Sequence, residues 1–129
     1  MYTLVQNQNF LDDIQLQKAD GTTEVLHISL SISSDTVKQY RQLQVRLMDL
    51  EKKRKSGINE EVASQIGMAI VDMFNLLFGK SNTQKLLEFY ADDFTRMAAE
   101  IFPYIQGEII PKFQQMAKIR KQALRKRRF

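Results

Sequence analysis

Cysteine is absent from this chain of 129 residues, and histidine occurs once. The lack of cysteine excludes disulfide bonds, thiolate nucleophiles and cysteine zinc sites together, and it agrees with a reducing compartment such as the cytoplasm. The lone histidine, His27, has no second histidine with which to share a metal ion. It falls on the polar side of a predicted strand, so we expect it to face solvent.

Long uninterrupted apolar runs are also missing. The N-terminus carries no basic segment followed by an apolar core, as a signal peptide would. The most apolar stretch, residues 66–78, is interrupted by Asp72 and Asn75, which disfavours a membrane span. We therefore expect a soluble protein without a membrane partner.

The remaining composition is that of an ordinary globular protein. Hydrophobic residues make up 43% of the chain and charged residues 26%, values that disfavour wholesale disorder. A chain of 129 residues is long enough for one hydrophobic core and too short for two. We predict a single domain over residues 1–129.

Charge is distributed unevenly along the chain. Residues 118–129 hold seven of the 19 basic side chains and no acid, which leaves 12 basic against 15 acidic residues in the rest. Three explanations stand for this basic tail: a solvated helix end, a site for a protein partner, or a clamp for nucleic-acid phosphates. The basic tail consists of Lys118, Arg120, Lys121, Arg125, Lys126, Arg127 and Arg128.

Strand-like alternation marks the N-terminal part of the chain. Apolar and polar residues alternate from residue 14 to 17 and again from 26 to 32, so that each segment has one apolar face. Asp20 and Gly21 lie between the two segments and tolerate the positive φ of a tight turn. The pattern predicts an antiparallel hairpin over 13–32, whose apolar face must pack on helices.

The period then changes to three or four residues, which predicts helices. Ser34 or Asp35 can cap the first helix, which ends before Gly57 with a basic last turn. The second helix begins at Asn59 and stops at Gly79. Its apolar stripe is the widest, so we expect it to be the most buried helix.

Two further helices follow in the C-terminal half. Ser81 with Gln84 predicts a capping box for a third helix, which is reset near Asp92. Pro103 is expected to bend or end that helix, and a last helix starts at Pro111.

Together these elements predict an α+β fold that is predominantly α-helical. An N-terminal two-stranded antiparallel hairpin packs on about four helices. The helical body covers residues 34–117, and the basic C-terminal tail covers 118–129.

One segment imitates a phosphate-binding loop. Gly79-Lys80-Ser81 matches the end of the loop motif, but the motif needs a glycine five residues before Gly79 and the chain has Phe74 there. A helix also precedes the segment where the motif requires a strand. A helix stop followed by a serine cap explains the segment instead.

Paired acidic residues are the remaining candidates for acid–base or metal chemistry. Neighbours on a helix do not face one another, so placement in first helical turns is the better explanation. We therefore predict no catalytic residue, no metal site and no cofactor, and hence a protein that is not an enzyme. The pairs are Asp12-Asp13, Glu60-Glu61 and Asp92-Asp93.

Aromatic residues recur through the helical body. Their helical spacing is more typical of a core than of a base-stacking platform. Six of them are nevertheless candidates for contacting a partner: Phe74, Phe78, Tyr90, Phe94, Phe102 and Tyr104.

The order of these elements resembles a known family. The chain has a hairpin with Asp20-Gly21 at its turn, a Ser34-Asp35-capped helix with Tyr40, and an amphipathic helix closing with Ile70-Val71-Asp72-Met73-Phe74-Asn75-Leu76-Leu77-Phe78-Gly79. Phe78-Gly79, followed by a polar turn and Lys85-Leu86-Leu87, is the most characteristic part. Over residues 10–90 the chain is similar to the tail assembly chaperones of long-tailed siphophages and prophages of Gram-positive hosts.

The resemblance implies a non-enzymatic chaperone of virion morphogenesis in the host cytoplasm. Such a chaperone coats the tape measure protein before the tail tube polymerises around it, and a longer frameshifted form recruits tail tube protein. Helices with wide apolar stripes suit weak, repeated contacts with a long helical partner. The same stripes lead us to expect a homo-oligomer.

Two other functions remain open from the sequence. The first is a small nucleic-acid-binding protein that uses the basic C-terminal helix, and the second is a structural head-tail joining protein of a phage virion. Salt dependence separates the first from apolar docking, because only a phosphate clamp loses affinity steeply as salt rises.

Overall fold

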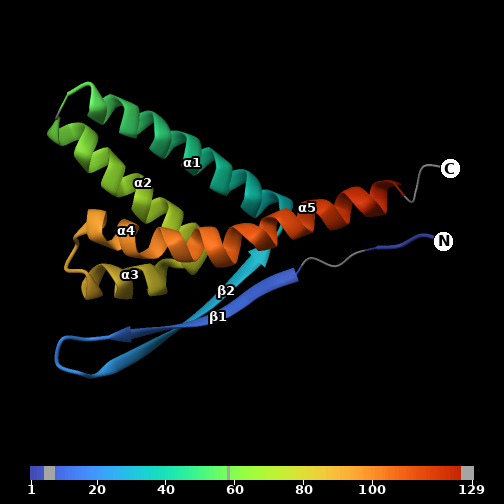
Figure 1. Ribbon diagram of the computed structural model, residues 1–129, viewed down its shortest axis with the longest axis horizontal. Helices are drawn as coiled ribbons and strands as arrows, with labels where there is room; N and C mark the ends of the chain where they lie inside the picture. Colours follow the sequence, from blue (N-terminus) through green and yellow to red (C-terminus); the bar gives the residue numbers. More distant parts are fainter. Residues whose placement is uncertain (5–7, 58, 126–129) are drawn as a thin grey trace.

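The structure, a computed structural model, describes residues 1–4, 8–57 and 59–125, with the backbone alone at Gln8, Ile119, Arg120 and 122–125. An N-terminal two-stranded antiparallel sheet packs on helices that make up most of the chain (Figure 1). The predicted α+β, predominantly helical fold is confirmed.

The sheet consists of β1 (Gln8–Gln17) and β2 (Thr23–Ile32), which pair along their whole length. Gly21 takes a φ of 87° in the connecting turn, and the Asp20 carboxylate accepts the backbone N–H of Thr22 at 2.9 Å. The predicted hairpin and its Asp-Gly turn are therefore present, because this pair supplies both the positive φ and the local hydrogen bond.

β1 begins at Gln8, five residues before the predicted start at residue 13. Phe10 is buried opposite Leu30, and a single polar residue on the same face, Asp12, interrupts the apolar alternation. Asp12 and Asp13 therefore lie within a strand, and their predicted place at the start of a helix is wrong.

The first two helices form an antiparallel pair. α1 (Ser34–Lys55) is capped by the hydroxyl of Ser33, one residue before the predicted cap, and α2 (Glu60–Phe78) is capped by Asn59 as predicted. Gly79 ends α2 with a φ of 85°, a conformation that glycine adopts at little cost. A single residue therefore separates α2 from the next helix.

α2 is the most buried helix, as its wide stripe predicted. Its Phe74 side chain is 0% exposed and meets the rings of Phe78 and Phe102 edge to face, at centroid distances of 5.4 Å and 6.1 Å. The buried residues of α2 are Ile66, Gly67, Ala69, Ile70, Met73, Phe74, Leu77 and Phe78.

α3 (Lys80–Phe89) begins directly after Gly79, so the predicted cap at Ser81 is wrong. The positive φ of Gly79 reverses the chain within one residue, and no separate serine cap fits between the helices. Side chains inside α3 bind carbonyl oxygens at this junction: Asn82 donates to the Phe78 oxygen and Thr83 to the Gly79 oxygen, both at 2.9 Å.

A break at residues 90–93 separates α3 from α4 (Phe94–Tyr104). Ala91 and Asp92 adopt left-handed conformations with φ of 51° and 60°, and Asp93 caps α4 by accepting a backbone N–H. The predicted reset at Asp92 is confirmed.

Pro103, which was expected to bend or end its helix, lies inside α4 and does not end it. The chain continues through the π-helical segment η1 (Ile105–Ile109) into α5 (Ile110–Arg125), forming one long rod. With α4, η1 and α5 counted as one segment, the hairpin packs on four helical segments, the other three being α1, α2 and α3. The helix continues past Pro103 because the buried side chains of Ile101 and Ile105, on either side of it, hold the segment against the core, which offsets the lost hydrogen bond and the ring clash of proline.

Buried residues in this rod recur every four positions, which explains the π turn. Four residues of an α-helix overshoot one full turn by about 40°, so a stripe spaced in fours drifts around the helix. In η1 the Ile110 N–H reaches back five residues to the Ile105 oxygen, and this wider turn takes up the drift. The buried stripe is Met97, Ile101, Ile105, Ile109 and Phe113.

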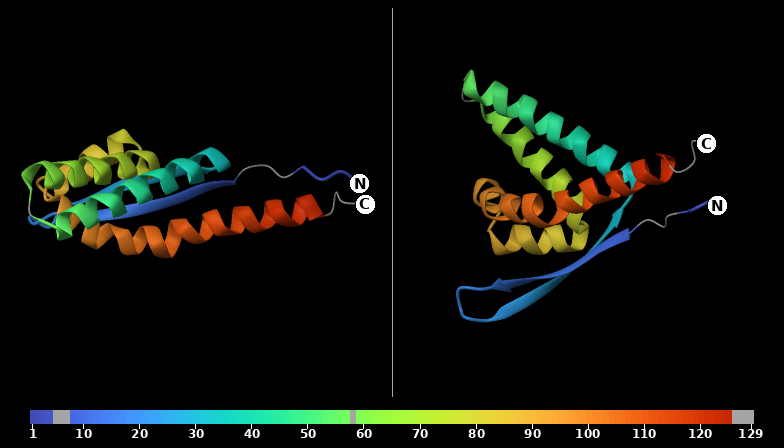
Figure 2. Two further views of the ribbon diagram at one scale, coloured as in Figure 1. Left: turned by 90° about the horizontal axis from the view of Figure 1, so that it is seen from above. Right: turned by 45° about the vertical axis from the view of Figure 1, so that its right-hand side comes forward.

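The elements meet in one core. The apolar face of β2 lies against helices, and the buried apolar side chains come from both strands and all five α-helices. Figure 2 shows that α1 and α2 lean away from the hairpin while α5 projects toward the end of the molecule where the N-terminal residues 1–4 lie.

α2 is long and apolar enough to cross a membrane by length and composition alone. A core helix of a soluble protein passes the same test, and α2 is packed between α1, α3, α4 and β2. Its packing is consistent with a soluble protein.

Candidate functional site

An apolar groove lies between the first half of α1 and the middle of α5. We call it the α1–α5 groove; its volume is about 640 Å³ and it is open to solvent. Most of its surface is carbon, which suits apolar side chains of a partner. Its lining residues are Ser34, Val37, Lys38, Arg41, Gln42, Val45, Met116 and Ala117.

One aromatic contact holds α5 against α1. The rings of Tyr40 and Phe113 are both buried, with their centroids 5.7 Å apart. One turn after Phe113, Met116 is half-buried and Ala117 is exposed. Burial therefore decreases beyond Phe113, and Met116 and Ala117 remain accessible to a partner.

α1 is oriented by an ion pair on its other side. Arg46 binds Asp72 of α2, with a distance of 2.8 Å between Nη1 and Oδ2. Val45, the preceding residue, points about 100° away around the helix and is 58% exposed in the α1–α5 groove. Met48, nearly one turn further along, is also exposed and extends the apolar strip.

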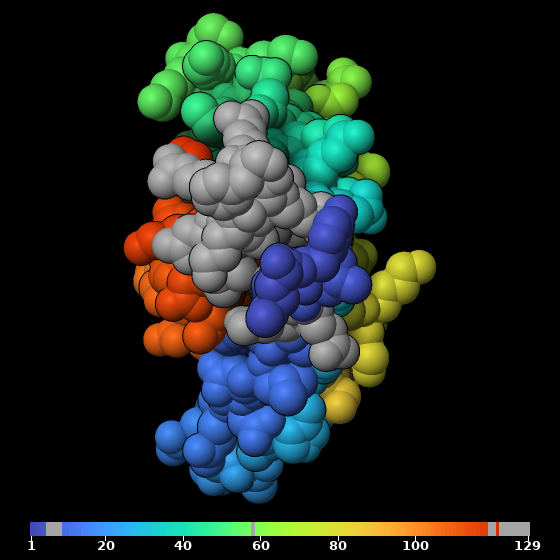
Figure 3. Space-filling view, turned by 90° about the vertical axis from the view of Figure 1, so that its right-hand side faces the viewer, coloured from blue at the N-terminus to red at the C-terminus, as the bar shows by residue number. Residues whose placement is uncertain are grey.

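A second hollow of about 320 Å³ flanks the same line of contact. It shares Val37, Arg41 and Ala117 with the α1–α5 groove and reaches down to Gln106 in the π-helical segment. The two hollows therefore adjoin each other where α1 and α5 face one another. Figure 3 faces the end of the molecule toward which α5 projects, with α1 in green and teal in the upper part, α5 in orange and red at the left, and the hairpin in blue below.

The groove walls carry positive charge. Lys38 and Arg41 line it, and α5 contains no acidic residue. The nearby acid in this part of α1, Asp35, accepts a hydrogen bond from the Gln39 amide at 2.7 Å. None of the ion pairs between described residues involves Lys38 or Arg41.

The six aromatic candidates for partner contact do not form a surface. Phe74, Phe78 and Tyr90 are buried in the core, Phe102 and Tyr104 are half-buried, and only Phe94 is exposed, at 36%. The prediction that aromatic residues belong mainly to the core is confirmed. In this fold the buried aromatic side chains are not accessible to a partner.

The basic tail is described only in part. Lys118 and Lys121 are exposed on the last turns of α5. The side chains of Arg120 and Arg125, and the whole of Lys126, Arg127 and Arg128, lie outside what the structure describes.

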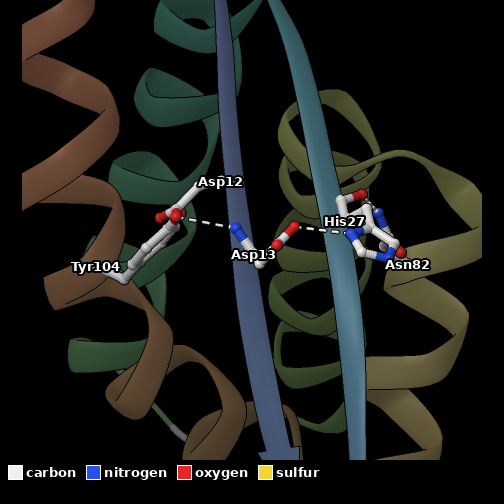
Figure 4. Close-up of polar contacts among 5 residues, drawn as sticks. All are labelled: Asp12, Asp13, His27, Asn82 and Tyr104. Carbon is white, nitrogen blue, oxygen red and sulfur yellow. Dashed lines mark hydrogen bonds and ion pairs between the residues drawn. The ribbon is translucent and has the colours of Figure 1, made fainter.

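Polar side chains on the hairpin form a second cluster (Figure 4). His27 faces solvent, as predicted, and its Nδ1 lies 2.7 Å from Oδ1 of Asp13 on the paired strand. Asn82 of α3 donates to the His27 carbonyl oxygen, which ties β2 to α3. On the other side of β1, the Tyr104 hydroxyl donates to the Asp12 carboxylate at 2.6 Å.

These contacts position the hairpin and do not converge on a reaction centre. Within residues 1–4, 8–57 and 59–125, no group of three or more histidine, aspartate or glutamate side chains could hold a metal ion. The acidic neighbours Asp12 and Asp13 turn to opposite faces of β1, toward Tyr104 and His27.

The Tyr104 contact has a measurable pH signature. Its hydroxyl lowers the pKa of the Asp12 carboxyl below the usual value, and the Asp13 N–H adds to the effect. A depressed pKa stabilises the fold above the pKa of the unfolded chain, and this stabilisation is lost as pH falls through the pKa of the folded state. Burial, with the Asp12 contact, raises the pKa of Tyr104, which stays neutral throughout.

We expect Tyr104→Phe to raise the pKa of Asp12 toward its value of about 3.9 in model peptides, as followed by NMR titration of the carboxyl carbon. The difference in unfolding free energy between the variant and the wild type should shrink below pH 4. An unchanged Asp12 pKa would contradict the hydrogen bond.

Sequence patterns did not single out the α1–α5 groove. Its signal was present in α1, where Val45 and Met48 lie outside the stripe formed by Val37, Tyr40, Leu43, Leu47 and Leu50. Apolar residues outside the buried stripe of a helix mark a surface. The wall that α5 contributes to the groove could not be predicted from the sequence, because it depends on the helix continuing past Pro103.

Comparison with known proteins finds no relative: no family model matches the chain, and neither does any curated protein or any solved structure.

Proposed function

We propose that this protein is a non-enzymatic tail assembly chaperone that binds the tape measure protein in the host cytoplasm during phage tail morphogenesis. The proposal rests on the resemblance of residues 10–90 to that family. It extends to the family's longer frameshifted form, through which tail tube protein would be recruited.

The observation that supports this function best is the α1–α5 groove. Tape measure proteins are long and mostly helical, and an amphipathic helix binds by placing its apolar face in such a groove. The shallow, open groove suits weak contacts repeated along one long partner, which gain strength through multivalency.

Coexpression with the tape measure protein from the same gene neighbourhood tests the proposal. We expect the tape measure protein to remain soluble and to copurify with the wild-type chain. Val45→Glu should abolish copurification, because it buries a charge in the contact.

Met68→Glu supplies a matched control, since Met68 is also 58% exposed but lies on α2 outside the α1–α5 groove. This variant should copurify as the wild type does. If the tape measure protein is insoluble alone and equally insoluble with the wild-type chain, the proposed function is wrong.

Self-association belongs to the same proposal. Leu11 and Val25 are exposed on the outer face of the hairpin, where they leave apolar surface that a monomer would normally cover. We expect light scattering to give a mass above the monomer's 15.1 kDa at tens of micromolar protein. Leu11→Lys should lower that mass, and a monomer at every concentration would contradict the prediction.

A further inference from the structure

We propose that the α1–α5 groove binds an amphipathic helix whose apolar stripe is flanked by glutamate or aspartate. This inference rests on the proposed function in taking the groove as the partner site, and it adds the chemistry of the segment that fits there. It is argued from the shape and charge of the groove, independently of which protein carries the segment.

The apolar part of the groove has the spacing of a helix. Val37, Val45 and Met48 form a strip along α1, and Met116 supplies the opposite wall from α5. Side chains three or four residues apart on a partner helix meet such a strip in succession. The volume of about 640 Å³ takes several apolar side chains, while the partner backbone lies above the groove.

The cations of the groove determine which residues can flank the apolar stripe of the partner helix. Lys38 and Arg41 rise from its α1 wall, and Lys121 lies one turn beyond Ala117 on α5. No ion pair among the described residues neutralises any of these three cations. Acidic residues beside the apolar stripe of a partner would complement them, and basic residues would be repelled.

An apolar floor distinguishes this site from a nucleic-acid surface. Phosphate contacts need cations without buried apolar area, whereas Val45 and Met116 place carbon between the cations of the groove. Duplex DNA could engage Lys38, Arg41 and Lys121 but would leave these apolar side chains uncovered.

The test uses two synthetic helices of 18 residues that share one leucine stripe. The acidic peptide has glutamate at the flanking positions, and the basic peptide has lysine at the same positions. We expect fluorescence anisotropy with the full chain to show the acidic peptide binding at least tenfold more tightly. Raising the salt from 50 to 500 mM should weaken it severalfold without abolishing binding, because the apolar contact is not screened.

Variants separate the two parts of the contact. Val45→Glu should weaken the acidic peptide at least tenfold, and Met68→Glu should leave it unchanged. The double variant Lys38→Glu with Arg41→Glu should reverse the preference in favour of the basic peptide. The control is the double variant Lys52→Glu with Lys53→Glu at the far end of α1, which changes the net charge by the same amount. This variant should keep the preference for the acidic peptide.

Three results would overturn the proposal. The first is equal binding of both peptides, and the second is competition by duplex DNA that is steep in salt and unaffected by Val45→Glu. The third is a loss of oligomer mass in Val45→Glu, which would make a second copy of this chain the occupant. The two experiments fail independently, because the peptide test uses synthetic helices. If the peptides do not bind as expected, the coexpression result still tests the proposed function. If coexpression fails, the peptide result still tests the chemistry of the groove.

Discussion

Phe74→Ala should lower the free energy of unfolding by about 3 to 5 kcal/mol, measured by urea denaturation. Phe74 is 0% exposed at the centre of α2, and its ring meets Phe78 and Phe102 edge to face. Truncation removes the transfer free energy of the ring and leaves a cavity that the hairpin and surrounding helices cannot fill without moving.

Phe94→Ala is the matched control, because it removes the same ring from a site that is 36% exposed. Its ring rests over Gly67, 3.2 Å from the position that a Cβ at Gly67 would occupy. We expect a smaller loss, of about 1 to 2 kcal/mol. A loss below about 1 kcal/mol for Phe74→Ala would show that this face of α2 is not the core.

Local chemistry explains which elements the sequence predicted well. The hairpin turn was predictable because Asp20 and Gly21 each supply a required feature, and α2 was predictable because Asn59 and Gly79 mark both of its ends. These signals act within a few residues and do not depend on the rest of the fold.

Errors arose where a distant contact decides local structure. Asp12 interrupts the apolar alternation of β1 and is tolerated because Tyr104, far along the chain, donates to it. Pro103 does not end its helix because buried residues on both sides keep the rod in contact with the core. In both cases tertiary packing overrides a local preference.

The candidate site depends on the same long-range arrangement. Val45 and Met48 were visible in the sequence as apolar residues outside the stripe of α1, but their partner wall was not. Met116 reaches α1 only because the rod continues through the π turn and Phe113 packs on Tyr40. A groove built from two helices far apart in sequence has no local signature.

Truncation after Ala117 should leave the fold and the α1–α5 groove intact. The truncation keeps Phe113, Met116 and Ala117, and the two removed cations whose side chains the structure describes, Lys118 and Lys121, are exposed. We expect the circular dichroism spectrum and the melting temperature to change little. Binding of the acidic peptide should persist, weakened by the loss of Lys121.

The same truncation decides whether the basic tail clamps nucleic acid. If it serves a protein partner or only solvates a helix end, labelled duplex DNA should bind the full chain weakly, with no submicromolar affinity near physiological salt. A clamp with four to seven phosphate contacts would instead give a slope of about −4 to −6 in the logarithm of affinity against the logarithm of salt. Such a slope, lost on truncation after Ala117, would replace the chaperone with the nucleic-acid-binding protein as the preferred function. The α1–α5 groove predicts a much shallower dependence, because its apolar contact is not screened by salt and only its flanking charges are.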